Sequence, residues 1–171
     1  MKYASYELAR MWNRTQLALT LAAFLLPALA VAQDLQVDRI VVHKSQRKMV
    51  LFSNGKKVKS YRVALGTQPV GPKQWRGDHK TPEGRYILDS RNVHSQFYKA
   101  FHISYPSPKD IQRARKLGVS AGGDVMLHGL PEGYVWDGED WTDGCIALTS
   151  NKEMDELWTT IRVGTPIEIK P

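Results

Sequence analysis

Short β-like segments separated by turn residues occupy most of this chain, and helical segments are scarce. Strand-like patterns are found at residues 39–42, 49–53, 57–65, 84–90, 102–105, 125–128, 145–148 and 166–170. Helical periodicity is limited to residues 109–117 and 151–161. Many short strands with so few helices favour a mainly β fold, in which a sandwich or barrel-like sheet carries one or two flanking helices.

The N-terminus has the pattern of a secretory signal peptide. Three basic residues precede an apolar run over residues 17–32, and the run ends in small residues that fit a cleavage site before Gln33. We therefore expect residues 1–32 to be a signal peptide and residues 33–171 to form a single exported domain. A membrane anchor is the alternative, but the run is short for a span and contains Pro27. The long stretch before the run leaves Met11 as an alternative start.

The chain is basic, with 24 Lys and Arg against 17 Asp and Glu and a formal net charge of +7. A basic surface suits nucleic acid, an anionic membrane or an acidic polymer, and charge alone does not choose between them. No phosphate-binding loop or nucleic-acid module is present, so we expect no nucleic-acid partner. Export to the periplasm or cell envelope would make cell-wall polymer the natural partner, with no stable membrane span after signal removal.

Cys145 is the only cysteine of the chain. A lone thiol in an exported protein is an inert buried group, half of an intermolecular bridge or a nucleophile. Gly144 allows a tight turn beside the sulfur, and backbone N–H groups in such a turn can face a developing oxyanion. A short apolar segment follows, and then Ser150 and Glu153 have the spacing of a capping box at a helix start.

A nucleophilic thiol needs a base, and His128 is the best placed of the five histidines. It ends a strand-like segment and precedes Gly129, so its side chain can reach into a cleft. A loop rich in Gly, Asp and Trp then leads to Cys145. The other histidines are scattered, with no His-x-His or His-Glu-x-x-His pair, so a zinc peptidase fits poorly and we expect no metal and no cofactor.

At these residues the sequence resembles the L,D-transpeptidase catalytic domain, also called the YkuD domain. The family signature is a His-Gly or His-Ser step, a variable loop, and then Ser/Thr-His-Gly-Cys with a short apolar strand. Here it is found at residues 128–129 and 142–148. Residues 81–86 match the family's Thr-Pro-x-Gly-x-Phe/Tyr turn, and residues 103–106 resemble one branch of the family. The resemblance covers about residues 37–170 and implies that residues 33–171 form one L,D-transpeptidase-like catalytic domain.

Two positions depart from the family pattern. Asp143 stands where the family usually has histidine, and Ala147 stands where it often has Arg or Asn. A carboxylate near the thiol disfavours the thiolate, unless it points away or orients another group. Ala147 lacks a side chain that could grip a substrate carboxylate. This form of the motif resembles a branch that includes enzymes that cut a lipoprotein from the cell wall.

The resemblance implies that the enzyme acts on peptidoglycan stem peptides through a thioester. His128 would take the proton of Cys145, and the thiolate would attack the carbonyl of meso-diaminopimelate or lysine at stem position three. Gly129 would orient the second ring nitrogen of His128 through its carbonyl. Backbone N–H groups near Gly144 and Cys145 would hold the oxyanion.

Supporting roles are expected for two neighbours of the cysteine turn. Thr142 would position either the oxyanion or the turn, and Trp141 would line the cleft or pin the loop. The acidic residues of the preceding loop are either solvated or select a cationic amine acceptor. These residues are Glu132, Asp137, Glu139, Asp140 and Asp143.

Three classes of function remain open. The first is an L,D-transpeptidase, which passes the acyl group to a second amine and cross-links or modifies the wall. The second is a hydrolase of the same fold, either an L,D-carboxypeptidase or endopeptidase or an amidase that releases a wall-attached lipoprotein. The third is a non-catalytic wall-binding protein, and the presence of His128, Gly144 and Cys145 together argues against it.

Overall fold

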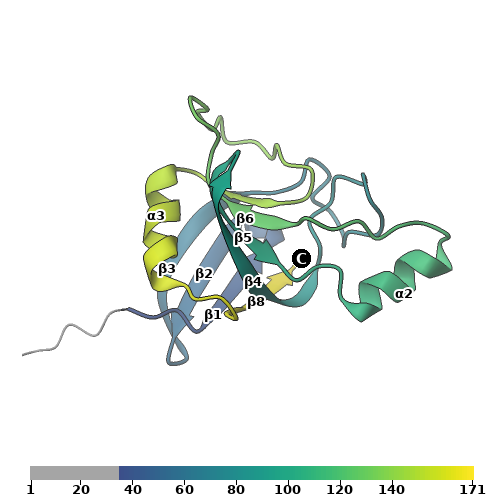
Figure 1. Cartoon of the computed structure of the whole chain (residues 1–171), viewed down its shortest axis with the longest axis horizontal. Helices are drawn as coiled ribbons and strands as arrows, with labels where there is room; N and C mark the ends of the chain where they lie inside the picture. The colour runs from purple at the N-terminus through teal and green to yellow at the C-terminus, as the bar shows by residue number, and fades with distance from the viewer. Residues whose placement is uncertain (1–34) are drawn as a thin grey trace, which may run out of the picture. The chain divides into compact units, whose positions relative to one another are not determined.

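The computed structural model describes residues 35–171, which form a closed eight-stranded β-barrel with two α-helices outside it (Figure 1). The mainly β prediction is confirmed, and its barrel form is the one adopted. The signal-peptide prediction falls on residues outside the described part of the chain. The strands are β1 Arg39–His43, β2 Lys48–Ser53, β3 Lys56–Ala64, β4 Gly84–Ser95, β5 Tyr98–Ile103, β6 Met126–His128, β7 Ile146–Leu148 and β8 Pro166–Lys170. The helices are the one-turn η2 Lys44–Gln46, α2 Pro108–Lys116 and α3 Asn151–Thr160.

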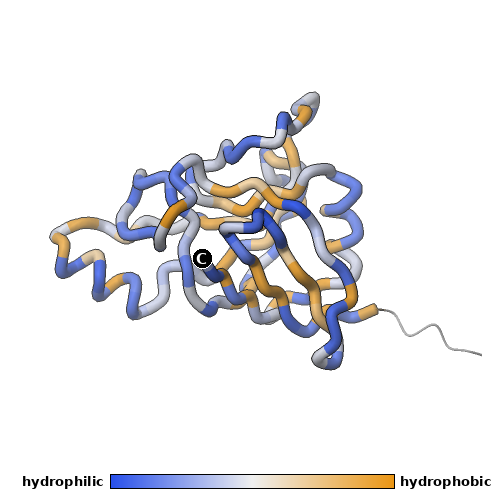
Figure 2. The backbone as a smooth tube through the Cα atoms, turned by 180° about the vertical axis from the view of Figure 1, so that it is seen from behind, coloured by the Kyte–Doolittle hydropathy of each residue, from blue (hydrophilic) through white to orange (hydrophobic). Residues whose placement is uncertain are grey.

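The strands follow the order β1-β2-β3-β7-β6-β5-β4-β8 around the barrel. Parallel pairing of β8 with β1 closes the sheet, with Ile40 opposite Ile167 and Val42 opposite Ile169. These four side chains are buried in the core, because every second residue of a strand faces the same side. Figure 2 shows the corresponding apolar colouring along the strands, while α2 and the loops are largely hydrophilic.

The β4–β5 hairpin is longer than its sequence predicts. The prediction ended the first strand at residue 90 and began the second at residue 102, whereas β4 continues to Ser95 and β5 starts at Tyr98. The extra residues are mostly exposed and polar, so they lack the apolar alternation that marks a half-buried strand. Cross-strand pairing, such as Asn92 with Ala100, maintains the strands there. The hairpin turn carries Phe97 to the site described below.

Both α-helices begin at a serine cap, close to their predicted starts. Ser107 and Asp110 form a full capping box at α2. At α3 the Ser150 side chain accepts the Glu153 N–H at 3.3 Å, but the Glu153 carboxylate accepts from Thr149 and not from Ser150. The capping box predicted there is therefore only half formed. Within residues 35–171, no helix combines the length and the apolar character needed to cross a membrane.

Candidate active site

Parallel pairing of β6 with β7 brings the two main candidate residues to neighbouring strands. His128 pairs with Ala147, and Leu127 pairs with Ile146. Leu127 and Ile146 belong to the barrel core, so the alternation of side chains places His128 and Ala147 on the outer face of the sheet. Cys145 immediately precedes β7, two residues before Ala147. The register therefore sets Cys145 beside Met126 of β6, two residues before His128 on the adjacent strand.

His128 is buried beneath aromatic side chains, with 1% of its surface exposed. Its Nδ1 lies 2.7 Å from the carbonyl oxygen of Gly129. A carbonyl only accepts hydrogen bonds, so Nδ1 carries the proton and Nε2 is left as an acceptor. Phe97 stacks on the ring with centroids 4.5 Å apart. Burial lowers the pKa of His128 to about 4, and the imidazole is neutral at pH 7.

Gly129 is required by a close approach as well as by its carbonyl. A Cβ atom at this position would lie 2.5 Å from Asn151 Oδ1. That oxygen accepts the Leu130 N–H at 2.7 Å, and the Asn151 amide donates to the Leu130 carbonyl at 3.2 Å. The start of α3 therefore holds the segment after His128 and fixes the direction of the Gly129 carbonyl.

Trp141 packs against the His128 ring. Its ring meets the His128 ring edge-on at 5.6 Å and lies 5.0 Å from the Tyr134 ring. Beside it, Asp140 accepts two hydrogen bonds from the Arg47 guanidinium at 3.0 and 2.7 Å, and its other oxygen accepts the Leu65 N–H at 2.9 Å. Trp141 thus packs between the rings of His128 and Tyr134, and its role stays a prediction. The structure gives Asp140 an anchoring role, which differs from both the solvated and the acceptor-selecting interpretations.

The turn before Cys145 is held by two threonine hydroxyls. Thr142 Oγ1 donates to the Cys145 carbonyl at 2.8 Å and accepts the Gly144 N–H at 3.2 Å. Thr81 Oγ1 lies 3.4 Å from the same carbonyl and accepts the Gly66 N–H at 3.0 Å. Thr142 therefore positions the turn, which is one of the two roles expected for it. Thr81 is a positioning residue that sequence reasoning missed, although its Thr-Pro-x-Gly motif was recognised.

Gly144 adopts a backbone conformation that other residues rarely tolerate. Its φ is +124°, and a Cβ atom would lie 2.6 Å from the Lys80 carbonyl oxygen. The loop that contains Lys80 packs directly on the cysteine turn, and the Thr67 N–H donates to the Thr142 carbonyl at 3.0 Å. The glycine therefore lets two backbone segments approach closely beside the sulfur.

The Cys145 thiol is protonated in this arrangement. Its Sγ accepts the Met126 N–H at 3.4 Å and lies 3.7 Å from the Asp124 carbonyl oxygen. Burial raises the pKa of Cys145 most strongly, the Met126 N–H opposes this, and the negative charge of Asp143 adds to the rise. The site thus holds a neutral thiol beside a neutral imidazole at pH 7.

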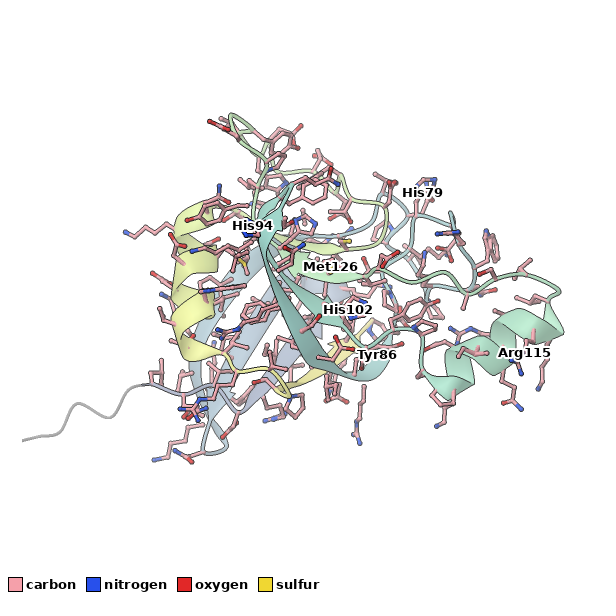
Figure 3. The ribbon with its side chains drawn as sticks, in the orientation of Figure 1. His79, Tyr86, His94, His102, Arg115 and Met126 are labelled. Atoms are coloured by element: carbon pink, nitrogen blue, oxygen red, sulfur yellow. The ribbon has the colours of Figure 1, made fainter. Side chains whose placement is uncertain are left out.

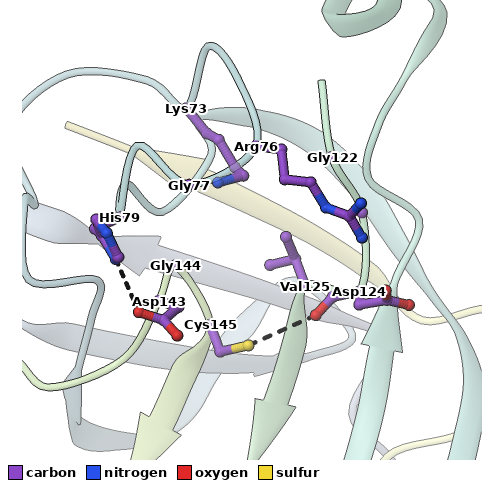
Figure 4. Close-up of a pocket in the computed structure, with 11 residues that line it drawn as sticks. Lys73, Arg76, Gly77, His79, Gly122, Asp124, Val125, Asp143, Gly144 and Cys145 are labelled. Carbon is purple, nitrogen blue, oxygen red and sulfur yellow. Dashed lines mark hydrogen bonds and ion pairs between the residues drawn. The ribbon is translucent and has the colours of Figure 1, made fainter. Parts of the chain in front are cut away.

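Asp143, which replaces the family histidine, is directed toward another side chain. Its carboxylate lies 2.8 Å from Nδ1 of His79. Figure 4 shows this carboxylate turned to His79, while the thiol of Cys145 turns to the Asp124 carbonyl. His79 lies 64 positions earlier in the chain, so local patterns give no signal for the pair. The second departure, Ala147, is fully buried and offers no side chain to a substrate.

Two grooves meet at Cys145. The first has a volume of about 330 Å³ and is lined by residues 73, 76, 77, 79, 122–125 and 143–145. The second, of about 370 Å³, is lined by residues 92, 94–97, 100, 124, 126 and 145. Cys145 and Asp124 line both, so they mark the junction. Figure 3 shows Met126 between His79 of the first groove and His94 of the second.

A metal-binding arrangement is absent from the described part of the chain. No group of three or more His, Cys, Asp or Glu side chains within residues 35–171 is placed to hold a metal ion.

Comparison with known proteins gives consistent matches. The family model of the L,D-transpeptidase catalytic domain, YkuD, matches residues 37–169. The Escherichia coli protein YafK, assigned by its name to the L,D-transpeptidases, is 33% identical over 101 residues, which are 58% of this chain and 35% of YafK. This chain thus matches about a third of the length of that relative.

Solved structures share the fold. Bd1075 of Bdellovibrio bacteriovorus is 28% identical, with a TM-score of 0.55 over 79% of this chain and 51% of that one. A variant of the helical cell shape determining protein Pgp2 of Campylobacter jejuni is 27% identical, with a TM-score of 0.62 over 81% and 49% of the chains. An L,D-transpeptidase of Xylanimonas cellulosilytica, at 14% identity and a TM-score of 0.53 over 80% and 62% of the chains, supports the fold alone. The family match over most of this chain, with these structures, shows that it belongs to the L,D-transpeptidase catalytic domain family, the YkuD family.

Proposed function

We propose that this protein is a cysteine-dependent acyl transferase that acts on peptidoglycan stem peptides, with Cys145 as nucleophile and His128 as base. The position of Cys145 at the junction of two grooves carries the proposal. A transferase has to place an acyl donor and an acyl acceptor at one nucleophile in turn. A groove on each side of the sulfur provides the two places.

The reaction starts from the neutral pair, because the pKa of Cys145 is raised and that of His128 is lowered. As Sγ bonds to the carbonyl carbon of stem residue three, the thiol proton passes to Nε2 of His128. The Gly129 carbonyl accepts a hydrogen bond from the Nδ1–H group and stabilises the imidazolium that forms, in the role that a carboxylate has in other triads. Holding the proton on Nδ1 also keeps Nε2 free for the transfer.

The tetrahedral oxyanion needs backbone donors at the cysteine turn. The Gly144 N–H already donates to Thr142 Oγ1 at 3.2 Å, so we assign the Cys145 N–H as the main donor. Collapse of the oxyanion breaks the bond to the leaving amine, which takes the proton from His128 and leaves a thioester. An amine from a second stem peptide then attacks the thioester, its proton returns through His128, and a new amide forms.

A hydrolase is the second candidate, in which water resolves the thioester. The observation that favours it is the burial of Ala147, because no side chain at this position reaches a groove to hold an acceptor. A wall-attached lipoprotein is proposed as a leaving group only from the resemblance of the cysteine motif to that branch of the family. A role in cell shape is proposed by analogy with Pgp2, whose name describes such a role. We also retain the proposals that residues 1–32 direct export to the periplasm and that residues 33–171 form the catalytic domain.

The two candidates give different products. The purified protein is incubated with tetrapeptide muropeptides, and in parallel with wall carrying an attached lipoprotein, and products are identified by mass spectrometry. Cys145→Ala is the matched control. Cysteine-dependent cross-linked dimers or exchange of the terminal D-amino acid would support the transferase. Cysteine-dependent loss of D-alanine or release of lipoprotein without a new amide would establish the hydrolase and refute the transferase.

A further inference from the structure

The first groove differs from the second in charge. Lys73 and Arg76 line the first groove, and both come from the loop between β3 and β4. The second groove is lined by no lysine or arginine. Figure 4 shows the two cationic side chains extending into the space on the Cys145 side of that loop. Because Cys145 lines both grooves, the two sides of the nucleophile differ in charge, with the cationic side chains only on the side of the first groove.

Lys73 is a buried cation held next to the cysteine turn. Its residue is 3% exposed, and Nζ lies 2.8 Å from Asp78 Oδ1. A Cβ atom on Gly144 would lie 3.7 Å from this Nζ, so the ammonium stands beside the backbone that positions the nucleophile. Asp78 also accepts the backbone N–H groups of Gln74, Trp75 and Lys80 at 2.6 to 3.2 Å. The Asp78 carboxylate therefore fixes the loop and neutralises much of the Lys73 charge.

Lys73 and Asp78 largely neutralise each other, so Arg76 is the main source of positive charge in the first groove. Within residues 35–171, no carboxylate forms a salt bridge with its guanidinium. Its backbone is nevertheless fixed, because its N–H donates to the Ser120 carbonyl at 2.8 Å. Its side-chain stem lies against Gly122, where a Cβ atom would come within 3.3 Å of Arg76 Cβ. An exposed guanidinium on a fixed backbone, without a bound carboxylate, is suited to bind one from a ligand.

The other acidic groups of the groove leave room for such a ligand. Asp143 is paired with His79, and Asp78 is paired with Lys73. Asp124 lines both grooves, and within residues 35–171 its carboxylate forms no salt bridge with Arg76 or Lys73. An anion is therefore best placed between Arg76 and Lys73.

We infer that Arg76, with Lys73 beside it, binds a free carboxylate of the stem-peptide donor and that the leaving-group side of the donor occupies the first groove. This inference rests on the proposed function, because it assigns the donor side of the same site. A tetrapeptide donor ends one residue past the bond that breaks, so its terminal carboxylate lies close to the nucleophile. The side-chain carboxylate of meso-diaminopimelate has the same chemistry and is the other source. It belongs to the acyl residue, so its recognition would place that residue, and not the leaving group, in the first groove.

Binding tests this inference without requiring turnover. The probes are the tetrapeptide, its terminal D-alaninamide form, the tetrapeptide with lysine in place of meso-diaminopimelate, and the peptide with both changes. Their dissociation constants are measured by calorimetry on Cys145→Ala and on the same protein carrying Arg76→Gln. We expect removal of the recognised carboxylate to weaken binding to Cys145→Ala about tenfold, and Arg76→Gln to abolish that difference. The probe that loses affinity identifies which carboxylate is bound.

Turnover gives the second readout, measured on proteins that retain Cys145. The kcat/KM for release of D-alanine or D-alaninamide is compared between the wild-type protein, Arg76→Gln and Lys80→Gln. Lys80 belongs to the same loop, but its Nζ donates to the Val70 carbonyl and it does not line the groove. We expect the wild-type protein and Lys80→Gln to prefer the peptide with the free terminal carboxylate over its amide. This preference should vanish in Arg76→Gln, while iodoacetamide still labels Cys145.

The two proposals fail in different ways. Carboxylate-dependent binding that needs Arg76, together with no cysteine-dependent product, would refute the acyl transfer and retain the carboxylate site. Cysteine-dependent products with equal affinity for all four probes, or equal losses for all four in Arg76→Gln, would refute the carboxylate site and retain the enzyme.

Discussion

Replacing His128 with glutamine should remove a specific part of the pH dependence of stability. The pKa of His128 is lowered by burial from 6.5 to about 4 in the folded protein. As pH falls below 6.5, the unfolded chain therefore takes up a proton that the folded protein does not, so stability falls between pH 6.5 and about 4. At about 1.4 kcal/mol per pKa unit, the loss between pH 7 and pH 4.5 is about 2 kcal/mol. Below the folded pKa of about 4 this contribution changes no further.

The assay is urea unfolding followed by tryptophan fluorescence, at pH 7 and at about pH 4.5, where about three quarters of the full loss has occurred. We expect the wild-type protein to lose about 2 kcal/mol more than His128→Gln over this interval. His94→Gln, which removes an exposed histidine, is the matched control and should behave like the wild type. Equal losses in the wild type and His128→Gln would show that the folded protein accepts the proton as readily as the unfolded chain, and would refute the lowered pKa of His128.

Three further predictions concern the turn and the loop around the nucleophile. Because burial raises the pKa of Cys145, its rate of labelling by iodoacetamide should still increase as pH rises through 9, and a plateau near neutral pH would contradict a neutral thiol. Gly144→Ala forces a residue with a Cβ atom to φ +124° against the Lys80 carbonyl, so it should lose at least about 1–3 kcal/mol in urea unfolding, and wild-type stability would refute the strain. Asp140→Asn removes the charged partner of Arg47, and we expect a loss of about 1–3 kcal/mol together with faster proteolysis of the 130–141 loop; unchanged proteolysis would show that Asp140 does not anchor that loop.

Local patterns predict the elements of this fold better than their connections. All eight strand-like segments and both helices exist, because alternation and serine caps are properties of neighbouring residues. The parallel closure of β8 on β1 and the β6–β7 pairing join distant segments, and no local pattern encodes them. The exposed continuation of β4 toward Ser95 was missed because pairing, and not burial, maintains it.

The candidate site divides in a similar way. Cys145, His128 and Gly129 could be predicted because chemistry and motif spacing point to them, and the structure gives His128 and Gly129 the expected hydrogen bond. Their catalytic roles remain predictions. Phe97 and His79 could not be predicted, because each reaches the site from a hairpin or loop far along the chain.

The most direct test of the central proposal is the intact mass of the protein after brief exposure to a tetrapeptide muropeptide. The account predicts a mass increase equal to the donor without its terminal D-alanine, located on the peptide that contains Cys145 and absent from Cys145→Ala. Hydroxylamine should remove the added mass, because a thioester reacts with it. An unmodified Cys145 while product accumulates, or an adduct that persists in Cys145→Ala, would contradict acyl transfer through this cysteine.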